Sequence, residues 1–330
     1  MAFFAIALAL LLEQVRPLGV DHPVVTGQRR WLQLVGSNVD AGGLQHGWLA
    51  WVLAVGIPTL AVVGVHWFLA WLGGWLLVLA WSVLVLYLTL GFRQFSHHFT
   101  GIRDALETGD EERARALLAA WQQVDVGAMP RSEIVRHVIE HSVLAAHRHV
   151  FGVLTWFSFL ALIGLGPAGA VFYRSAEHAA RAWHREAEVP DQPISPALSR
   201  VASAAWHAID WLPARMTALG FAIVGSFDDA IDVRRNHASR FPDSNDGVIL
   251  AATAGALGVR LGGASLRPVA ADAAGRPLPS PAAPAAPAGE EFPGDTARTS
   301  HFTQVVGLVW RTVALWLLLL VLLTLAHVLG

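Results

Sequence analysis

One short pattern in the sequence has residue types that could bind a metal ion and hydrolyse a peptide bond. His137-Val138-Ile139-Glu140-His141 matches the H-x-x-E-H order of inverted zinc peptidases. On a helix the two histidines, four residues apart, share one face and could ligate zinc, with Glu140 activating a water molecule. No clear third ligand follows downstream, and a chain with 15 His can contain such a pattern by chance. A polar helix end is the simpler interpretation, and the zinc site is kept as an alternative.

Two further groups of polar residues adjoin apolar segments. His147 and Arg148 precede a long apolar run, where they could hold a phosphate or carboxylate group or lie at a membrane interface. Arg215 stands at the entry of an apolar helix, with Pro213 in the first turn and Asp210 five residues before it. An ionisable residue at membrane depth indicates function by default, and an ion pair between Asp210 and Arg215 is the structural alternative.

The composition is that of a membrane protein rather than of a soluble domain. Hydrophobic residues make up 54% of the 330 residues, charged residues 15%, and the mean hydropathy is +0.48, whereas soluble chains carry about 25% charge. A formal net charge of -2 argues against nucleic acid as a partner. The lack of Cys excludes disulfides, iron–sulfur clusters and thiolate zinc sites. We therefore predict an all-α, polytopic helical protein with the membrane as its partner.

Four apolar segments predict membrane spans. Residues 41–92 contain no charged side chain and, at about 1.5 Å per residue, reach roughly 78 Å, enough for a hairpin with its turn at Gly73-Gly74. The other two spans fall within 149–173, where a Gly-Pro stretch should end or break the helix, and within 305–329. Two further apolar runs, 1–12 and 216–227, are too short to cross the membrane alone, and their placement stays open. The total is therefore four to six membrane segments.

The distribution of arginines predicts the orientation. Segment 93–148 contains seven Arg, and the turn at 73–74 contains none, so the positive-inside rule places 93–148 in the cytoplasm of a bacterial cell with a multi-pass inner-membrane protein. Its apolar stripe at helical spacing predicts a packed helical loop. Proline and alanine in 264–304 instead predict a flexible linker. The predicted regions are an apolar segment with its loop, a hairpin, the cytoplasmic loop, a membrane-embedded core, the linker and a last helix: 1–47, 48–92, 93–148, 149–263, 264–304 and 305–330.

A series of motifs points to a family. In chain order they are Val138–Ser142, Gly166–Arg174, Leu212–Leu219, Ser244–Gly247 and Ala254–Gly263. As a set they resemble the CbiB/CobD family of cobalamin biosynthesis, over roughly 92–263. The chain is also similar to AmpE, a membrane relative of that family named for β-lactamase induction.

The resemblance implies an ATP-dependent, amide-forming ligase of the inner membrane. Such an enzyme joins aminopropanol, free or phosphorylated, to the propionate carboxyl of the corrinoid adenosylcobyric acid, using ATP and Mg²⁺. It implies two sets of site residues. The predicted catalytic residues are Glu140, Arg148 and Arg215. The predicted substrate-binding residues are His147, Tyr173, Arg174, Asp210 and Asn245, and no metal-ligating residue is assigned.

Several acidic motifs of that family are replaced in this chain. Residues 124–129 stand where the family has Gly-Arg-Asp-Thr, 146–152 where it has Ala-Glu-Asn, and 206–210 where it has Asp-Asp-x-x-Asn. The lost carboxylates would hold metal and phosphate in an amide ligase. Their replacement leaves an alternative open, in which the chain is an AmpE-like, non-catalytic membrane protein of cell-wall or antibiotic signalling, with a protein partner on the cytoplasmic loop.

Overall fold

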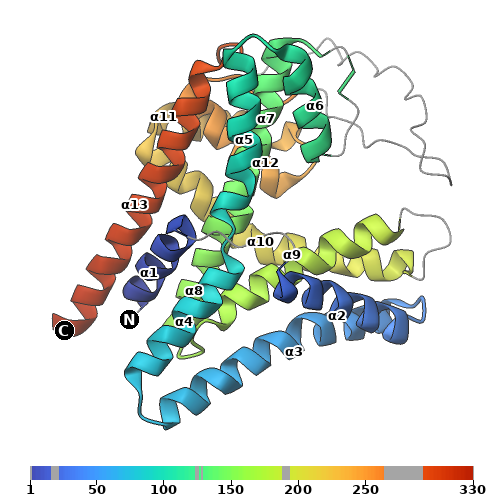
Figure 1. Cartoon of the computed structure of the whole chain (residues 1–330), viewed down its shortest axis with the longest axis vertical. Helices are drawn as coiled ribbons and strands as arrows, with labels where there is room; N and C mark the ends of the chain where they lie inside the picture. Colours follow the sequence, from blue (N-terminus) through green and yellow to red (C-terminus); the bar gives the residue numbers. More distant parts are fainter. Residues whose placement is uncertain are drawn as a thin grey trace. The chain divides into compact units, whose positions relative to one another are not determined.

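The computed structural model describes residues 2–15, 22–122, 126–127, 129–187, 194–263 and 293–329, with only the backbone at 92–97 and 327–329. These residues form α-helices joined by short turns, and one isolated β-bridge (Figure 1). The chain divides into two compact units. The first unit comprises 1–94, 147–216 and 316–330, and the second comprises 95–146 and 217–315. The predicted all-α class is confirmed.

The first unit begins with four helices. They are α1 (Ala2–Val15), α2 (Pro23–Val39), α3 (Leu44–Trp71) and α4 (Trp75–Thr89). The last two form the predicted hairpin, and Gly73 at its turn has a φ of 77°, which a residue with a side chain rarely adopts. Helix α2 is amphipathic and packs on α3, where the Trp31 indole donates to the Ala54 carbonyl at 3.1 Å.

The second half of the first unit is built around a tightly packed helix pair. α8 (Gly152–Leu162) follows the π-helical turn η1 (His147–Phe151), and α9 (Ala168–Ala187) returns after the expected break at the Gly-Pro stretch. A Cβ on Gly169 would lie 1.9 Å from the Trp156 carbonyl oxygen, so only glycine lets α8 and α9 come this close. Helix α9 also packs on α2, α3 and α4.

Helices α10 (Pro196–Val224) and α13 (Ser300–Leu329) contribute residues to both units. The apolar run 216–227 is therefore mostly the end of a 29-residue helix and not a separate short segment. Helix α13 begins at Ser300, five residues before the predicted start of the span at 305. The predicted linker lies largely outside the described residues; its end is held by a β-bridge between Val259 and Asp295.

The second unit contains shorter helices. Those not yet named are α5 (Phe92–Glu107), α6 (Glu111–Gln122), α7 (Arg131–Ala146), α11 (Phe227–His237) and α12 (Ser244–Leu257), with a 3₁₀ turn at Ala238–Arg240. The predicted cytoplasmic loop is thus helical, and Asp110 caps α6 by accepting from the Arg113 amide at 3.0 Å. α11 packs closely on α12 at Gly255, which has no side chain. A Cβ there would lie only 2.3 Å from the Asp229 carbonyl oxygen.

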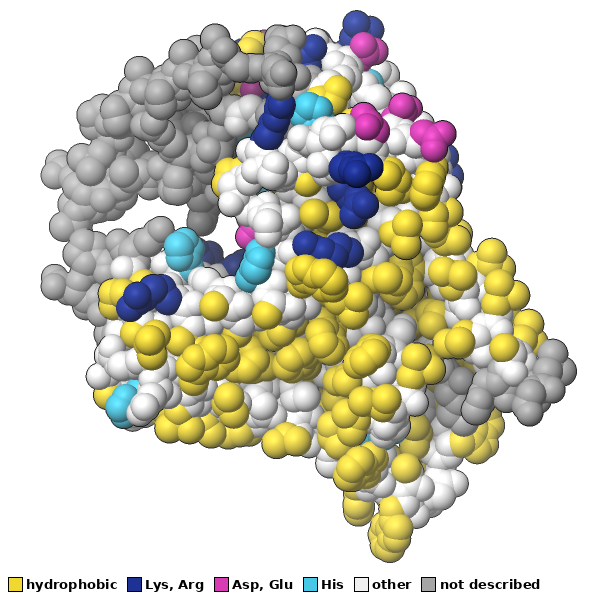
Figure 2. All heavy atoms as spheres, turned by 180° about the vertical axis from the view of Figure 1, so that it is seen from behind, with side chains coloured by type: hydrophobic (Ala, Val, Ile, Leu, Met, Phe, Trp, Pro, Cys, Tyr) yellow, Lys and Arg dark blue, Asp and Glu magenta, His cyan; other side chains and the backbone are white. Residues whose placement is uncertain are grey.

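Among the residues that the structure describes, three helices are long and apolar enough to cross a membrane: Leu44–Trp71, Arg131–Leu162 and Ser300–Ala326. α1 and α4 are apolar but shorter, and the 15 residues of α4 reach only about 23 Å. The third predicted span is therefore part of a helix that begins at Arg131 and ends at Leu162. Large hydrophobic side chains of α3 and α4 are exposed, among them Leu60 at 69% and Trp71 at 80%. Figure 2 shows hydrophobic side chains, in yellow, over much of the face that it presents.

Candidate functional site

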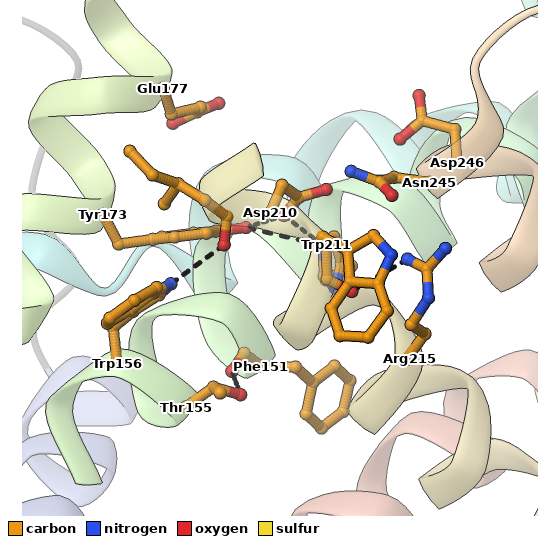
Figure 3. Close-up of polar contacts among 12 residues, drawn as sticks. Phe151, Thr155, Trp156, Tyr173, Glu177, Asp210, Trp211, Arg215, Asn245 and Asp246 are labelled. Atoms are coloured by element: carbon orange, nitrogen blue, oxygen red, sulfur yellow. Dashed lines mark hydrogen bonds and ion pairs between the residues drawn. The ribbon is translucent and has the colours of Figure 1, made fainter. Parts of the chain in front are cut away.

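Three of the predicted site residues form a buried hydrogen-bonded cluster in the first unit. The Tyr173 hydroxyl donates to Asp210 Oδ1 at 2.7 Å, and His147 Nε2 lies 2.9 Å from the same oxygen. All three residues are at most 1% exposed. Figure 3 shows the Tyr173 hydroxyl pointing at Asp210, and Trp156, whose indole donates to the Ile209 carbonyl beside it at 3.1 Å. The cluster ties η1, α9 and α10 together.

Electrostatics keep this cluster ionised at Asp210 and neutral at Tyr173. Burial raises the pKa of the Asp210 carboxyl, but the charges of His147 and Arg148 and the two hydrogen bonds outweigh burial and leave that pKa below its usual value. Burial, and next the Asp210 charge, raise the pKa of Tyr173 well above its usual value. Asp210 is therefore an acceptor and Tyr173 a donor at neutral pH.

The local sequence explains how the cluster is assembled. A π-helical turn carries one extra residue per turn and is often found at functional sites; here it spans His147–Phe151. Directly after it comes Gly152, where a Cβ would lie 2.1 Å from the Tyr173 hydroxyl oxygen. A glycine at this position is thus required for Tyr173 to reach Asp210.

A second polar cluster lies one turn further along α9. The Glu177 carboxylate accepts from Arg174 and lies 2.7 Å from an Arg181 guanidinium nitrogen, with its side chain 2% exposed. Burial raises the pKa of Glu177, yet the two arginine charges lower it more, so its pKa is far below the usual value. His178 Nδ1 lies 2.6 Å from the Gln28 amide oxygen of α2, and its Nε2 lies 3.2 Å from an Arg174 nitrogen.

These partners define the state of His178. The Gln28 oxygen accepts, so Nδ1 carries the proton, and Nε2 accepts from Arg174. Burial, together with the Arg174 charge, lowers the pKa of His178 to about 3. His178 is therefore a neutral link between α2 and α9.

A cavity of about 560 Å³ opens beside this second cluster in the first unit. Its polar lining residues are Gln28, Arg29, His149, Arg174, Ser175 and His178. The rest of the lining consists largely of apolar side chains of α2, α3 and α4. The cavity volume lies within the usual range for small-molecule sites of about 300–1,000 Å³.

The other two predicted cations of the first unit are partly exposed. Arg148 belongs to η1, and its charge acts on both Asp210 and Tyr173. The Arg215 guanidinium lies 4.2 Å from the Trp211 ring centroid and donates to the Trp211 carbonyl at 2.9 Å, as Figure 3 shows. The predicted ion pair of Asp210 with Arg215 is wrong, because in the described part of the chain the Asp210 carboxylate is held by His147 and Tyr173.

The remaining two predicted site residues belong to the second unit. Glu140 Oε1 accepts from an Arg136 guanidinium at 2.9 Å and from the Gly262 backbone amide at 2.7 Å. Its carboxylate thereby fixes the segment after α12, where Gly262 has a φ of 91°. Asn245 is 2% exposed and stands in the first turn of α12, which Asp243 caps. The assignment of all eight residues to a substrate stays a prediction.

The structure does not support a zinc site at the H-x-x-E-H pattern. An Arg136 nitrogen lies 2.9 Å from His137 Nε2, so a guanidinium occupies the place next to the histidine where a cation would bind. The His141 ring instead packs against Trp121, with 4.4 Å between ring centroids. Within the ranges that the structure describes, no three His, Asp or Glu side chains lie close enough to hold a metal ion.

Comparison with known proteins identifies the family. The model of the family described as CobD/CbiB protein matches residues 2–283. A relative from Stutzerimonas stutzeri named cobalamin biosynthesis protein CobD is 30% identical over 96% of both chains. The chain belongs to the CobD/CbiB family. With its candidate spans, this makes it a helical membrane protein.

Further CobD/CbiB relatives cover smaller shares of the chain. A protein of the same name from Chromobacterium violaceum is 32% identical over 55% of both chains, and one from Leptospira interrogans is 26% identical over 80% of this chain and 83% of its own. No solved structure matches this chain.

Sequence reasoning missed part of the site in the first unit. Gln28, Glu177 and His178 were not selected, although the last two lie one turn from Arg174 on the polar face of α9. The spacing of these two from Arg174, three and four residues, could have indicated them. The contact of His178 with Gln28, 150 residues away, carries no local signal.

Proposed function

We propose that this chain acts in cobalamin biosynthesis as a multi-pass inner-membrane protein that joins aminopropanol, free or phosphorylated, to the propionate carboxyl of adenosylcobyric acid. The observation that carries the proposal is the family match over residues 2–283 together with 30% identity over 96% of the chain to a cobalamin biosynthesis protein CobD. The alternative of an AmpE-like signalling protein gains no support from these relatives.

Within this proposal the described residues divide into two roles. The partly exposed guanidiniums of Arg148 and Arg215 would bind carboxylate or phosphate oxygens of the substrates through charge-assisted hydrogen bonds. His147, Tyr173 and Asp210 are too deeply buried for that and would act as positioning residues that fix η1, and so Arg148, against α9 and α10. Glu140 would hold the Gly262 backbone in the same indirect way.

The resemblance also implies ATP and Mg²⁺, and the carboxylates of Asp210, Glu177 and Glu140 fit a magnesium ion poorly. Magnesium is usually held by one or two carboxylates with waters and phosphates. Asp210, Glu177 and Glu140 all have cationic or hydrogen-bonding partners at their oxygens already. These three carboxylates therefore do not form a magnesium site as they stand, and a membrane assay measures whether the reaction requires the ion.

The experiment is complementation of a bacterium that lacks its own CbiB/CobD. The strain carrying this chain is expected to grow, under cobalamin-dependent conditions, on cobyric acid as well as on cobinamide, which bypasses the missing step. Growth on cobinamide alone, with the protein verified in the membrane fraction, would overturn the proposal. Adding or withholding ATP and Mg²⁺ in a membrane assay then measures each requirement.

Two matched variants of α10 test the role of the predicted cation. Arg215→Ala is expected to abolish growth on cobyric acid while the protein remains in the membrane. Arg200→Ala is the control, because Arg200 lies on the same helix, is exposed, and likewise donates to the carbonyl four residues earlier. Equal growth of the two variants would show that Arg215 does not contact substrate.

A further inference from the structure

The lining of the cavity in the first unit combines charged and apolar side chains. Its charged residues include Arg29 from α2 and Arg174 from α9. Its apolar residues, here called the apolar wall, include Trp31 of α2, Val62 of α3 and Val85 of α4. Helix α3 is a candidate membrane span and α4 is an apolar helix, so this wall has the composition of a surface that contacts hydrocarbon.

Two nitrogen atoms in the cavity lining have no hydrogen-bond partner within the described part of the chain. They are Trp81 Nε1 of α4 and His149 Nδ1 of η1, and both atoms are buried. Buried polar atoms in native proteins are paired with very few exceptions, so such atoms beside a cavity indicate that an occupant supplies the missing partner. An indole N–H can only donate, which requires an acceptor from that occupant.

Arginines outnumber carboxylates around the polar part of the lining. Arg174 and Arg181 both pair with Glu177, and Arg29 adds a further positive charge that acts on His178. Glu177 pairs with Arg174 and Arg181, whereas Arg29 is exposed at the cavity lining without a partner among the described residues. A ligand with an anionic group would balance this excess.

We propose that the cavity binds an anionic phospholipid, with its phosphate between Arg29 and Arg174 and one acyl chain along the apolar wall of α2, α3 and α4. A soluble anion would satisfy the guanidiniums but leave the apolar wall in contact with water. Basic pockets beside membrane helices recognise anionic headgroups by this combination. The site goes beyond the proposed cobalamin function, and its occupant need not enter that reaction.

The test measures lipid binding directly on the delipidated full chain in detergent. Phosphatidylglycerol and phosphatidylcholine are titrated separately, and the bound lipid is counted by native mass spectrometry. We expect phosphatidylglycerol to bind at least about tenfold more tightly. Arg29→Gln is expected to remove this preference, and Arg30→Gln to keep it, because Arg30 is exposed on the same helix but does not line the cavity. Equal binding of the two lipids to the unaltered chain would overturn the proposal.

A second variant tests the apolar part of the site. Gly27 lines the cavity, and a Cβ at this position would meet nothing within 4 Å, so Gly27→Leu adds an apolar side chain to the lining at a position that accepts one. It is expected to reduce the bound phosphatidylglycerol at least about tenfold. Unchanged binding would overturn the proposal. Competition by glycerol phosphate as strong as that by phosphatidylglycerol would do so too, because the ligand would then be a free anion. None of these readouts depends on growth on cobyric acid.

Discussion

Two carboxylates, the buried Asp210 of the first unit and the partly buried Glu140 of the second, are stabilised in different ways. In the first unit, Asp210 of α10 is held by His147 and Tyr173, which lie 63 and 37 residues away in the chain. In the second unit, Glu140 has its cationic partner Arg136 four residues away on the same helix, and adds one distant bond to the Gly262 amide. The first arrangement depends on three packed helices and the second largely on one.

The two units differ in which partners remain for an arginine when one carboxylate is removed. Arg136 contacts Glu133 at 2.6 Å as well as Glu140, so the loss of Glu140 still leaves that guanidinium with a charged partner. Within the described ranges, Arg174 is paired with one carboxylate, Glu177, and also contacts the neutral His178. We therefore expect substitutions in the first unit to lower the free energy of unfolding more than the matching change in the second.

The largest decrease in the free energy of unfolding is expected for Glu177→Gln. It leaves the 11% exposed Arg174 side chain without a carboxylate, and breaking a buried pair costs about 3–5 kcal/mol. Thermal unfolding of the purified protein in detergent measures this. Glu186→Gln on the same helix is the control, expected to stay within about 0.5 kcal/mol, because that side chain is only half-buried. Similar losses from both variants would remove the special role of Glu177.

The next largest loss of unfolding free energy is expected for Asp210→Asn. It keeps the shape of the side chain but replaces two bonds to a charged acceptor with weaker ones, and such bonds are worth about 1.5–3 kcal/mol. The same unfolding measurement applies. A variant as stable as the unaltered chain would contradict a structural role for the cluster of His147, Tyr173 and Asp210.

A pH dependence of intermediate size is expected from His178. Its pKa is lowered to about 3 in the folded chain, so the unfolded chain binds more protons between pH 6.5 and 3. The contribution of His178 is complete above pH 6.5 and is lost as the pH falls, on the order of 2 kcal/mol between pH 7 and 5. His178→Gln should show a flatter profile over this window. Parallel profiles for the two proteins would exclude His178 as the cause.

The smallest loss of unfolding free energy, about 1–2 kcal/mol, is expected for Glu140→Gln. Arg136 keeps its contact with Glu133, and the oxygen of the new glutamine side chain can still accept from the Gly262 backbone amide. Glu133→Gln is the matched control at the other carboxylate of Arg136; its side chain is 41% exposed, so about 0–1 kcal/mol is expected. A loss for Glu140→Gln that exceeds that of Glu177→Gln would reverse the comparison between the two units.

The sequence predicts the helical class, the hairpin and the family, because each follows from patterns that are local in the chain. Helix spacing puts Arg136 beside Glu140, and apolar runs mark α3 and α13. The pairing of His147 with Asp210 could not be predicted, since no local pattern brings residues 63 apart together. The alternative pairing of Asp210 with Arg215 rested on nearness in sequence; Asp210 instead bonds His147 and Tyr173, and Arg215 lies against Trp211.

The contacts around the π-helical turn η1 require a fixed number of residues between His147 and Gly152. His147 must face Asp210, and Gly152, five residues later, must face Tyr173. Deleting one codon between them would turn the side chains that follow by about 100° along the helix axis, so both contacts could not be kept. In an alignment of relatives, a gap between these two positions would mark proteins in which this corner is built differently, even where every named residue is retained.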